Sequence, residues 1–409
     1  MRRLNFIKLL SGLFFSFLLL APLRAESPKS DEFPQDLEGD LSGGTTALYH
    51  LQFKEAEEKF RHAIEARPEH PAPYFFLTML RWYELSYDSL LYQNSSLEKA
   101  LMDQASLTVK VAKKFSRDKS SQSSGFLYWA GALGAKGWYH RTRSQWVRAY
   151  FSGKKGYNLL QKTIDLKPEL YDAYLGIGMY EYYAATLGPF LKVLASFSVR
   201  GDKDRALQYL NLAQSKSKYV RFEAAYFLWN AALEERNLGE AVRRAQELEH
   251  FFPHSPLFRW CKIQTLFYQK DWAAVLRECD EYIAESKKAQ NGKNNTFFLL
   301  LSKVHYHQGA ALFSLGKIDE APLYFEKCLE DKTPFAGWKV MSLLRLGELR
   351  DLKGNRSEAE RAYREVLNLP DYWDSHSKAR KRLSEPFKPT TSLEDVMTSP
   401  LQTWNSDLN

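Results

Sequence analysis

One spaced pattern of small and large residues constrains this chain more than any other feature. Ala56 is followed four residues later by Phe60, and Ala63 and Pro68 complete the pattern. On a helix this spacing puts the alanines and the ring on one face, where small side chains let a second helix approach and the ring fills the space between. Proline then ends the helix. A hairpin of two such helices cannot bury its own apolar face, so the pattern predicts hairpins that stack on one another.

The pattern recurs along the chain with a nearly constant period. The step from Ala206 to Ala241 is 35 residues, and the step from there to Val275 is 34. One or two divergent units cover residues 73–114 and 125–168. We therefore expect an all-α chain with seven or eight helical hairpins over residues 41–383. The other second helices are marked by Gly156, Leu160, Thr163 and Pro168; by Leu210 and Ala213; by Ala245, Leu248 and Pro253; by Cys279 and Tyr282; by Ala321, Phe325 and Cys328; and by Ala359, Tyr363 and Val366, while Gly178, Gly309 and Gly347 mark first helices.

These units resemble tetratricopeptide repeats in their period and in their small and aromatic positions. A further set of residues lies within the stretch 171–258: Tyr174, Gly176, Ile177, Gly178, Tyr180, Tyr182 and Tyr183, followed by Gly201, Asp202 and residues 206–210. This set resembles the tetratricopeptide repeat 39 family and its bacterial relatives. The resemblance implies a right-handed solenoid with a concave groove that holds peptides or protein segments. It implies no reaction.

The two ends of the chain differ from its centre. Arg2, Arg3 and Lys8 precede an apolar stretch at residues 9–20, and Ala25 offers a small residue at a cleavage site. This order predicts a signal peptide over residues 1–25 and an exported protein, periplasmic or envelope-associated if the source is bacterial. An uncleaved anchor is the alternative, although the stretch is shorter than the ~20 residues that span a bilayer. We expect a flexible leader at 26–40 and a loose C-terminal tail at 384–409.

Charge and cysteine content exclude some classes of protein. The formal net charge is +8, and cleavage after Ala25 would lower it to +4 because four cations leave with the signal peptide. This charge gives no reason to expect a nucleic-acid partner. The three cysteines, Cys261, Cys279 and Cys328, lack the spacing of a zinc or redox site, so we expect small buried side chains. A disulfide between Cys261 and Cys279 is the alternative.

Aromatic residues on the first helices are the candidate ligand-binding residues. Chaperone-binding members of the repeat family clamp a terminal carboxylate with Lys and Asn, whereas the matching faces here carry Phe75 and Met79, then Leu175 and Met179. We therefore expect apolar and aromatic contacts to hold a protein or peptide partner. Core packing is the alternative for each of these side chains. The groove that we predict consists of Phe75, Met79, Trp82, Tyr83, Met179, Tyr182 and Tyr183.

Two further segments suggest surface contacts. Arg141, Arg143 and Arg148 alternate with Trp138, Tyr139, Trp146 and Tyr150, which indicates either a solvated helix face or a surface for an anionic partner or lipid head group. Residues 184–199 are apolar but too short to cross a membrane. They are expected to pack on the solenoid or to touch a membrane or partner.

No catalytic constellation is recognised in the sequence. His305 and His307 lie two apart, on different sides of a helix, so they cannot share a metal without other ligands. We expect no cofactor, no metal and no enzymatic activity. The function expected is an exported scaffold that binds a protein partner in its groove. A membrane-peripheral envelope factor is the alternative, and an enzyme with a site in the groove is a remote one.

Overall fold

The computed structural model describes residues 35–87, 94–143, 145–186, 201–289, 296–331 and 336–388, and every regular element within these ranges is helical. The whole predicted signal peptide lies outside the described residues. So do residues 26–34 of the predicted leader, residues 187–199 of the apolar segment and residues 389–409 of the predicted tail. The elements are α1 (Gln35–Tyr49), α2 (Phe53–Ala66), α3 (Pro71–Ser86), α4 (Ser95–Phe115), α5 (Gln122–Thr142), α6 (Trp146–Leu166), α7 (Asp172–Thr186), α9 (Lys203–Lys216), α10 (Arg221–Glu234), α11 (Leu238–Phe251), α12 (Pro256–Tyr268), α13 (Trp272–Ala289), the short 3-10 helix η1 (Phe297–Leu300), α14 (Leu301–Ser314), α15 (Ala321–Glu330), α16 (Ala336–Leu352), α17 (Arg356–Leu367) and α18 (Ser375–Ser384).

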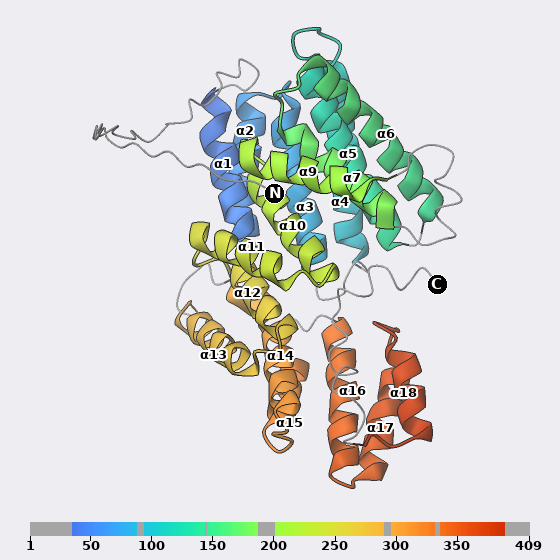
Figure 1. Cartoon of the computed structure of the whole chain (residues 1–409). Coiled ribbons are helices and arrows are strands. Elements are labelled where there is room, and N and C mark those ends of the chain that lie inside the picture. The colour runs from blue at the N-terminus through green and yellow to red at the C-terminus, as the bar shows by residue number, and fades with distance from the viewer. Residues whose placement is uncertain are drawn as a thin grey trace, which may run out of the picture.

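The described α-helices pair into eight hairpins, from α1–α2 to α16–α17, and α18 packs on the last of them. Successive hairpins also contact one another, so the hairpins form a stack (Figure 1). The predicted all-α solenoid of seven or eight hairpins is confirmed. The two divergent units of the sequence are the hairpins α3–α4 and α5–α6.

Helix starts follow from local sequence. The Asn94 side chain accepts hydrogen bonds from the backbone amides of Ser96 and Leu97 at the start of α4. The Ser255 hydroxyl accepts one from the amide of Phe258, and Pro256 occupies the first turn of α12. These side chains satisfy amides that have no partner inside the helix.

The predicted pattern of small and large residues forms the contacts within and between hairpins. Ala56, Phe60 and Ala63 are all fully buried. A Cβ atom added to Gly347 on α16 would lie 2.5 Å from the ring of Tyr363 on α17, and one added to Gly44 on α1 would lie 2.3 Å from the ring of Phe60. Glycine is therefore required at these positions because the partner helix places an aromatic ring against its backbone.

The hairpin α5–α6 uses small residues on both of its helices. Ala130, Gly134 and Gly137 repeat at spacings of four and three on α5, and Ala149, Gly153 and Gly156 repeat in the same way on α6. A Cβ atom on Gly156 would lie 3.2 Å from the carbonyl oxygen of Ala130, and one on Gly137 would lie 3.3 Å from that of Ala149. The two helices thus approach each other with no large side chain between them.

Both predicted boundaries of the solenoid differ from the structure by several residues. The first helix begins at Gln35 and not at Leu41, because Leu37 and Leu41 lie one helical turn apart and both are fully buried. The predicted loose tail begins with residues that still pack. Phe387 is buried, and its ring centroid lies 5.9 Å from that of Phe313.

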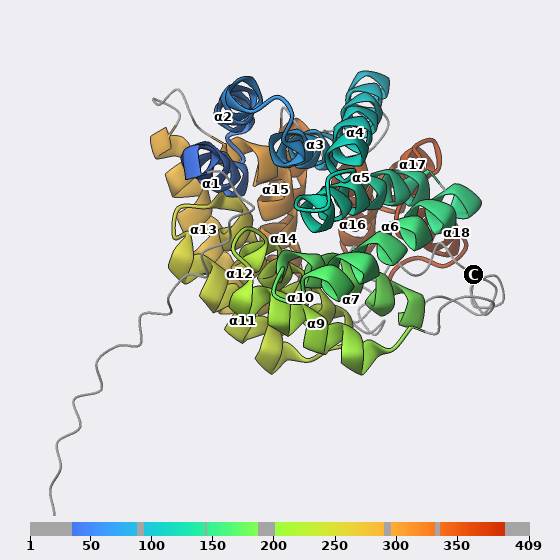
Figure 2. The same ribbon diagram turned by 90° about the horizontal axis from the view of Figure 1, so that it is seen from above.

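The middle of the stack contacts the end of the first helix. The Ser255 hydroxyl donates to the carbonyl oxygen of Tyr49 at 2.5 Å, and the Thr296 hydroxyl donates to that of His50 at 2.6 Å. The Tyr49 ring also contacts Phe252 with a centroid separation of 5.0 Å. One turn of the superhelix therefore brings α1 beside the hairpin α12–α13, as Figure 2 shows from above. The first helices of the hairpins lie toward the inside of this turn.

Closure of the turn buries the carboxylate of Glu223. Tyr83 on α3 lies close to Glu223 on α10, although the two are far apart in sequence, and both are close to the end of α1 at Tyr49. Burial raises the pKa of Glu223 to about 7. Its Oε2 atom has no hydrogen-bond partner among the described residues.

We expect Gly347→Ala to lower the free energy of unfolding by about 1–3 kcal/mol, because the new methyl group would overlap the Tyr363 ring. Gly39→Ala is the matched control. No atom lies within 4 Å of its added Cβ, and alanine favours a helix by up to ~1 kcal/mol over glycine. Urea denaturation of both variants provides the measurement, and equal effects at the two positions would contradict the proposed fit.

Glu223→Gln is expected to remove a pH dependence of stability. Native Glu223 keeps its proton up to about pH 7, whereas the unfolded chain loses it near the ordinary value of 4.5. The free energy of unfolding of the wild type therefore falls as pH rises between these values, by up to about 3 kcal/mol. The variant should be more stable than the wild type at about pH 8 and similar to it at about pH 5.

Urea denaturation at both pH values tests this expectation, with the exposed Glu65→Gln as control. A Glu223→Gln variant that lost the same stability at both pH values would show that the carboxylate is charged and structurally required.

Candidate functional site

Four aromatic side chains form a continuous line across successive first helices. Trp82 on α3, Trp138 on α5, Tyr183 on α7 and Phe227 on α10 are neighbours, with ring-centroid separations of 5.6, 5.3 and 5.5 Å along the line. We call these four residues the aromatic row. Trp82, Trp138 and Tyr183 are half-buried, and Phe227 is buried.

The stacking of hairpins explains why these residues meet. Trp82, Trp138 and Tyr183 all lie in the last turn and a half of their first helices. Because stacked hairpins place equivalent positions side by side, aromatic residues at these positions form a line although some 50 residues separate one from the next. The first helices line the inner side of the superhelical turn (Figure 2), so the row lies on that side.

One arginine stacks on the row. The Cζ atom of Arg141 lies 4.3 Å from the ring centroid of Trp138 and 5.5 Å from that of Tyr183. A guanidinium at this distance is attracted to the faces of both rings, and it holds them in place. Arg141 also acts electrostatically on Glu234.

Acidic residues lie beside the row at the end of α10. The Tyr182 hydroxyl donates to Glu234 Oε2 at 3.3 Å and to Glu235 Oε1 at 3.1 Å, and Lys203 pairs with Glu235 at 3.0 Å. Burial raises the pKa of Glu234 to about 7, while the Tyr182 hydroxyl and Arg141 oppose that rise. The row is thus bordered by polar groups that already interact with one another.

The structure places two of the seven predicted groove residues in the aromatic row and the other five elsewhere. Trp82 and Tyr183 belong to the aromatic row, but Tyr182 is almost fully buried and packs edge-on against Phe227. Tyr83 packs against the large core cluster where the superhelical turn closes. Phe75 and Met79 lie on α3 and Met179 on α7. The Phe75 ring packs against Tyr128, Met179 packs beside the Tyr182 cluster, and Met79 is half-buried. Ligand binding by any of the seven stays a prediction.

Sequence reasoning missed two members of the row. The sequence pattern places Trp138 with the arginines that follow it and gives no sign of a role for Phe227. The signal that would have found them is the repeat register: an aromatic residue near the end of each first helix from α3 to α7. Phe227 lies earlier in its helix, so only the structure shows that it continues the row.

The three predicted surface arginines do not form one surface. Arg141 lies over the aromatic row, as described above. Arg143 is exposed and pairs with Glu98 at 3.4 Å. Arg148 is exposed on α6, with a 3.5 Å contact to the Gln145 side chain. Arg141 thus lies with the row on α5, whereas Arg148 lies on α6, the outer helix of the hairpin (Figure 2).

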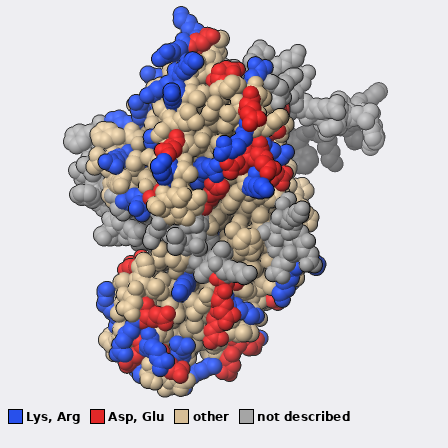
Figure 3. Space-filling view, turned by 180° about the vertical axis from the view of Figure 1, so that it is seen from behind, with Lys and Arg blue, Asp and Glu red and all other residues tan. Residues whose placement is uncertain are grey.

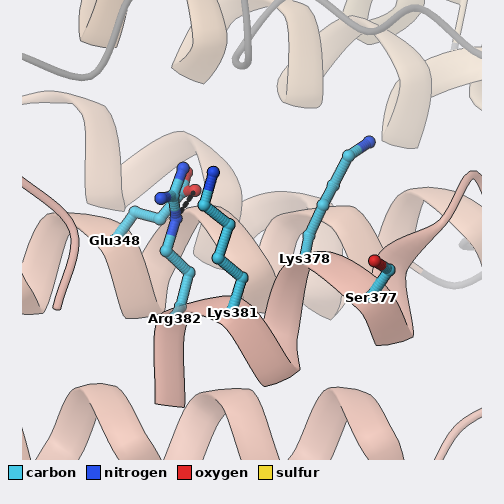
Figure 4. A pocket seen from close by; sticks show the side chains of 5 residues that line it. All are labelled: Glu348, Ser377, Lys378, Lys381 and Arg382. Carbon is cyan, nitrogen blue, oxygen red and sulfur yellow. Dashed lines mark hydrogen bonds and ion pairs between the residues drawn. The ribbon is translucent and has the colours of Figure 1, made fainter. Parts of the chain in front are cut away.

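A small pocket lies at the far end of the solenoid, between α16 and α18 (Figure 4). Its volume is about 110 Å³, well below the roughly 300–1,000 Å³ of typical ligand sites. Arg382 on its wall donates to Glu348 at 3.0 Å, and Lys378 donates to the carbonyl oxygen of Trp373 at 2.9 Å. These cations stabilise the last hairpin, where Glu348 also pairs with the buried Arg345.

The described residues contain no group of three or more His, Cys, Asp or Glu side chains that could hold a metal ion. His305 contacts Asp331 at 3.0 Å, whereas His307 is buried against Trp260 and Trp338. Cys261, Cys279 and Cys328 are free and buried, as the sequence predicts, and burial raises the pKa of each thiol. Within the described part of the chain, no helix is both long and apolar enough to cross a membrane.

Comparison with known proteins identifies the repeat. The family model of the tetratricopeptide repeat matches residues 302–330, which are the hairpin α14–α15 with its Gly309, Ala321 and Phe325 positions. The hairpin α14–α15 is a tetratricopeptide repeat, and the chain is a protein that contains this repeat. No curated protein matches this tetratricopeptide repeat protein in sequence.

Solved structures resemble this tetratricopeptide repeat protein at low sequence identity. NprR in complex with its cognate peptide NprX shares 13% identity, covers 91% of this chain and 89% of its own, and gives a TM-score of 0.41. Yeast Tom70 shares 12% identity, covers 85% and 89%, and gives 0.44. A tetratricopeptide repeat protein from Parabacteroides merdae shares 11% identity, covers 86% and 98%, and gives 0.32. With these TM-scores, the likenesses carry no inference about what this chain binds.

Proposed function

We propose that this tetratricopeptide repeat protein is an exported, non-catalytic scaffold that holds an extended segment of a partner protein along the aromatic row. The observation that carries the proposal is the line of rings on four successive hairpins. Rigid aromatic side chains are enriched where proteins bind one another because they bury a large area at little cost in conformational entropy.

The dimensions of the row suit an extended peptide. Its three centroid separations of 5.6, 5.3 and 5.5 Å cover up to about 16 Å, which is the length of about five extended residues. Alternate side chains of such a segment point to the same side. We infer that aliphatic or aromatic residues at every second position of the partner rest between neighbouring rings.

The polar groups around the row favour binding over chemistry. Tyr182, Glu234, Glu235 and Lys203 hydrogen-bond or pair with one another, and Arg141 is stacked on two rings. Groups that satisfy each other in this way hold the rings in position and give the border of the row a mixed charge. An apolar segment with polar flanks is therefore the partner that fits best.

Export is the second part of the proposal. It is supported by the cationic start, the apolar stretch at residues 9–20 and the small residue at position 25. A periplasmic or envelope location follows if the source is bacterial.

Expression of the full chain in a bacterial host, followed by fractionation and intact-mass measurement, tests the export proposal. We expect the soluble envelope fraction to contain a chain that begins at Glu26. A cytosolic chain of full mass would contradict export, and an envelope-bound chain of full mass would support the uncleaved anchor.

Selection of peptides from a displayed library on the purified chain tests the binding site. For the selected peptides, we expect Trp138→Ala and Trp82→Ala each to weaken affinity by about tenfold or more, because each removes a rigid ring from the row. Leu323→Ala, an exposed apolar residue on α15, is the matched control and should leave affinity unchanged.

Circular dichroism and urea denaturation confirm that each variant folds. If peptides bind equally well to folded Trp82→Ala, Trp138→Ala and Tyr183→Ala variants, the row is not the binding site.

A further inference from the structure

One hairpin accounts for the net positive charge of the whole chain. Residues 119–164 contain eight Lys and Arg residues and no Asp or Glu, whereas the chain as a whole contains 57 of the former and 49 of the latter. The remainder of the chain is therefore neutral, with 49 of each sign. These 46 residues include all of α5 and nearly all of α6. Figure 3 shows Lys and Arg along the upper left margin, on the side where α5 and α6 lie, while most Asp and Glu of the upper part lie toward its other side.

The outward face of α6 combines this charge with exposed apolar side chains. Phe151, Val147 and Leu166 are 63%, 62% and 55% exposed, which makes them the most exposed large apolar side chains in the described part of the chain. All three lie on α6. Gly156, Leu159, Leu160 and Thr163 form the buried face of the same helix. Val147 and Phe151 are one turn apart on the opposite face.

The cations beside these side chains lack acidic partners. Arg148, Lys154, Lys155 and Lys162 form no ion pair with any carboxylate among the residues that the structure describes. Lys154 and Lys155 instead lie 5.8 Å and 5.3 Å from the rings of Tyr150 and Trp129. The ammonium groups of both lysines thus lie beside aromatic rings, and no carboxylate of the described residues competes with an anion for them.

The hairpin also extends beyond the one that follows it. The helices α5 and α6 have 21 residues each, whereas α7 and α9 have 15 and 14. Six or seven extra residues lengthen a helix by roughly 10 Å. The end that carries Val147 and Phe151 is at the turn between α5 and α6, and α6 lies at the outer margin of the molecule (Figure 1).

We propose that the outward face of α6, from Val147 to Lys162, docks on an anionic membrane surface. Apolar and aromatic side chains that insert among lipid head groups, flanked by Lys and Arg that contact lipid phosphates, are the features of an interfacial helix. The sequence predicts an anionic-partner surface at Arg141, Arg143 and Arg148. The proposed docking face keeps Arg148 and contains Lys154, Lys155 and Lys162 in place of Arg141 and Arg143.

Charge argues against a second copy of the chain as the occupant. A symmetric dimer through this face would bring Lys154, Lys155 and Lys162 of one chain against those of the other, and like charges in contact are unfavourable. The membrane-docking proposal is also independent of the proposed function. The aromatic row uses the inner face of α5, whereas the docking face is the outer face of α6, so both surfaces can be occupied at once.

Vesicle co-sedimentation tests the proposal. The test uses the chain from Glu26 onward, which retains every described residue, because the apolar stretch at 9–20 would itself bind lipid. We expect binding to vesicles that contain phosphatidylglycerol, weak binding to phosphatidylcholine alone, and loss of binding at high salt. The double variant Val147→Ser/Phe151→Ser, and separately Lys154→Glu/Lys155→Glu, should each reduce the partition coefficient by about tenfold or more.

Matched controls distinguish this surface from others. Leu323→Ser removes an exposed apolar residue on α15, and Lys317→Glu reverses a surface charge elsewhere, and neither should change vesicle binding. Trp138→Ala should affect peptide binding only. The proposal is overturned if the chain does not bind anionic vesicles, if the α6 variants bind as well as the wild type, or if analytical ultracentrifugation shows a dimer that the α6 variants dissociate.

Discussion

The contact of a small residue on one helix with a large ring on its partner is the constraint on which the rest of this structure depends. Phe60 fits against Gly44, and Tyr363 fits against Gly347, at distances that leave no room for a methyl group. A single hairpin leaves its other apolar face exposed, so each hairpin must pack on the next. The repetition of this one requirement produces a stack in which equivalent residues of successive hairpins lie side by side.

Closure of the superhelical turn adds a contact that repetition alone does not supply. Ser255 and Thr296 bind the backbone at the end of α1, and Tyr49 packs among the phenylalanines of the middle hairpins. This closure fills the part of the inner side around Tyr83 and raises the pKa of Glu223. The inner surface is therefore not a uniform groove. The aromatic row is the part of it where three half-buried rings and the buried Phe227 line up across hairpins.

The two proposed surfaces follow from the two sides of one hairpin. Trp138 and Arg141 on α5 belong to the inner row, and Val147 and Phe151 on α6 form the outer face. The small residues between α5 and α6 bring these helices close together and make the hairpin a thin, long element. If both proposals hold, the chain binds a partner segment on its inner side while its outer side rests on an anionic membrane surface.

The sequence alone determined the repeat, because the spacing of alanine, glycine and aromatic residues is a local property of each hairpin. The spacing of Ala56, Phe60 and Ala63, for example, predicts that they share one buried face, and all three are buried. It also identified Trp82 and Tyr183 as residues of interest, since each lies near the end of a first helix. Only the tertiary structure decided that Tyr182 and Tyr83 belong to the core, that Phe227 extends the row, and that Arg141 faces inward while Arg148 faces outward. The reason is physical. Which ring meets which depends on the twist between hairpins and on the return of the chain to α1, and these are sums over many contacts that no single stretch of sequence contains.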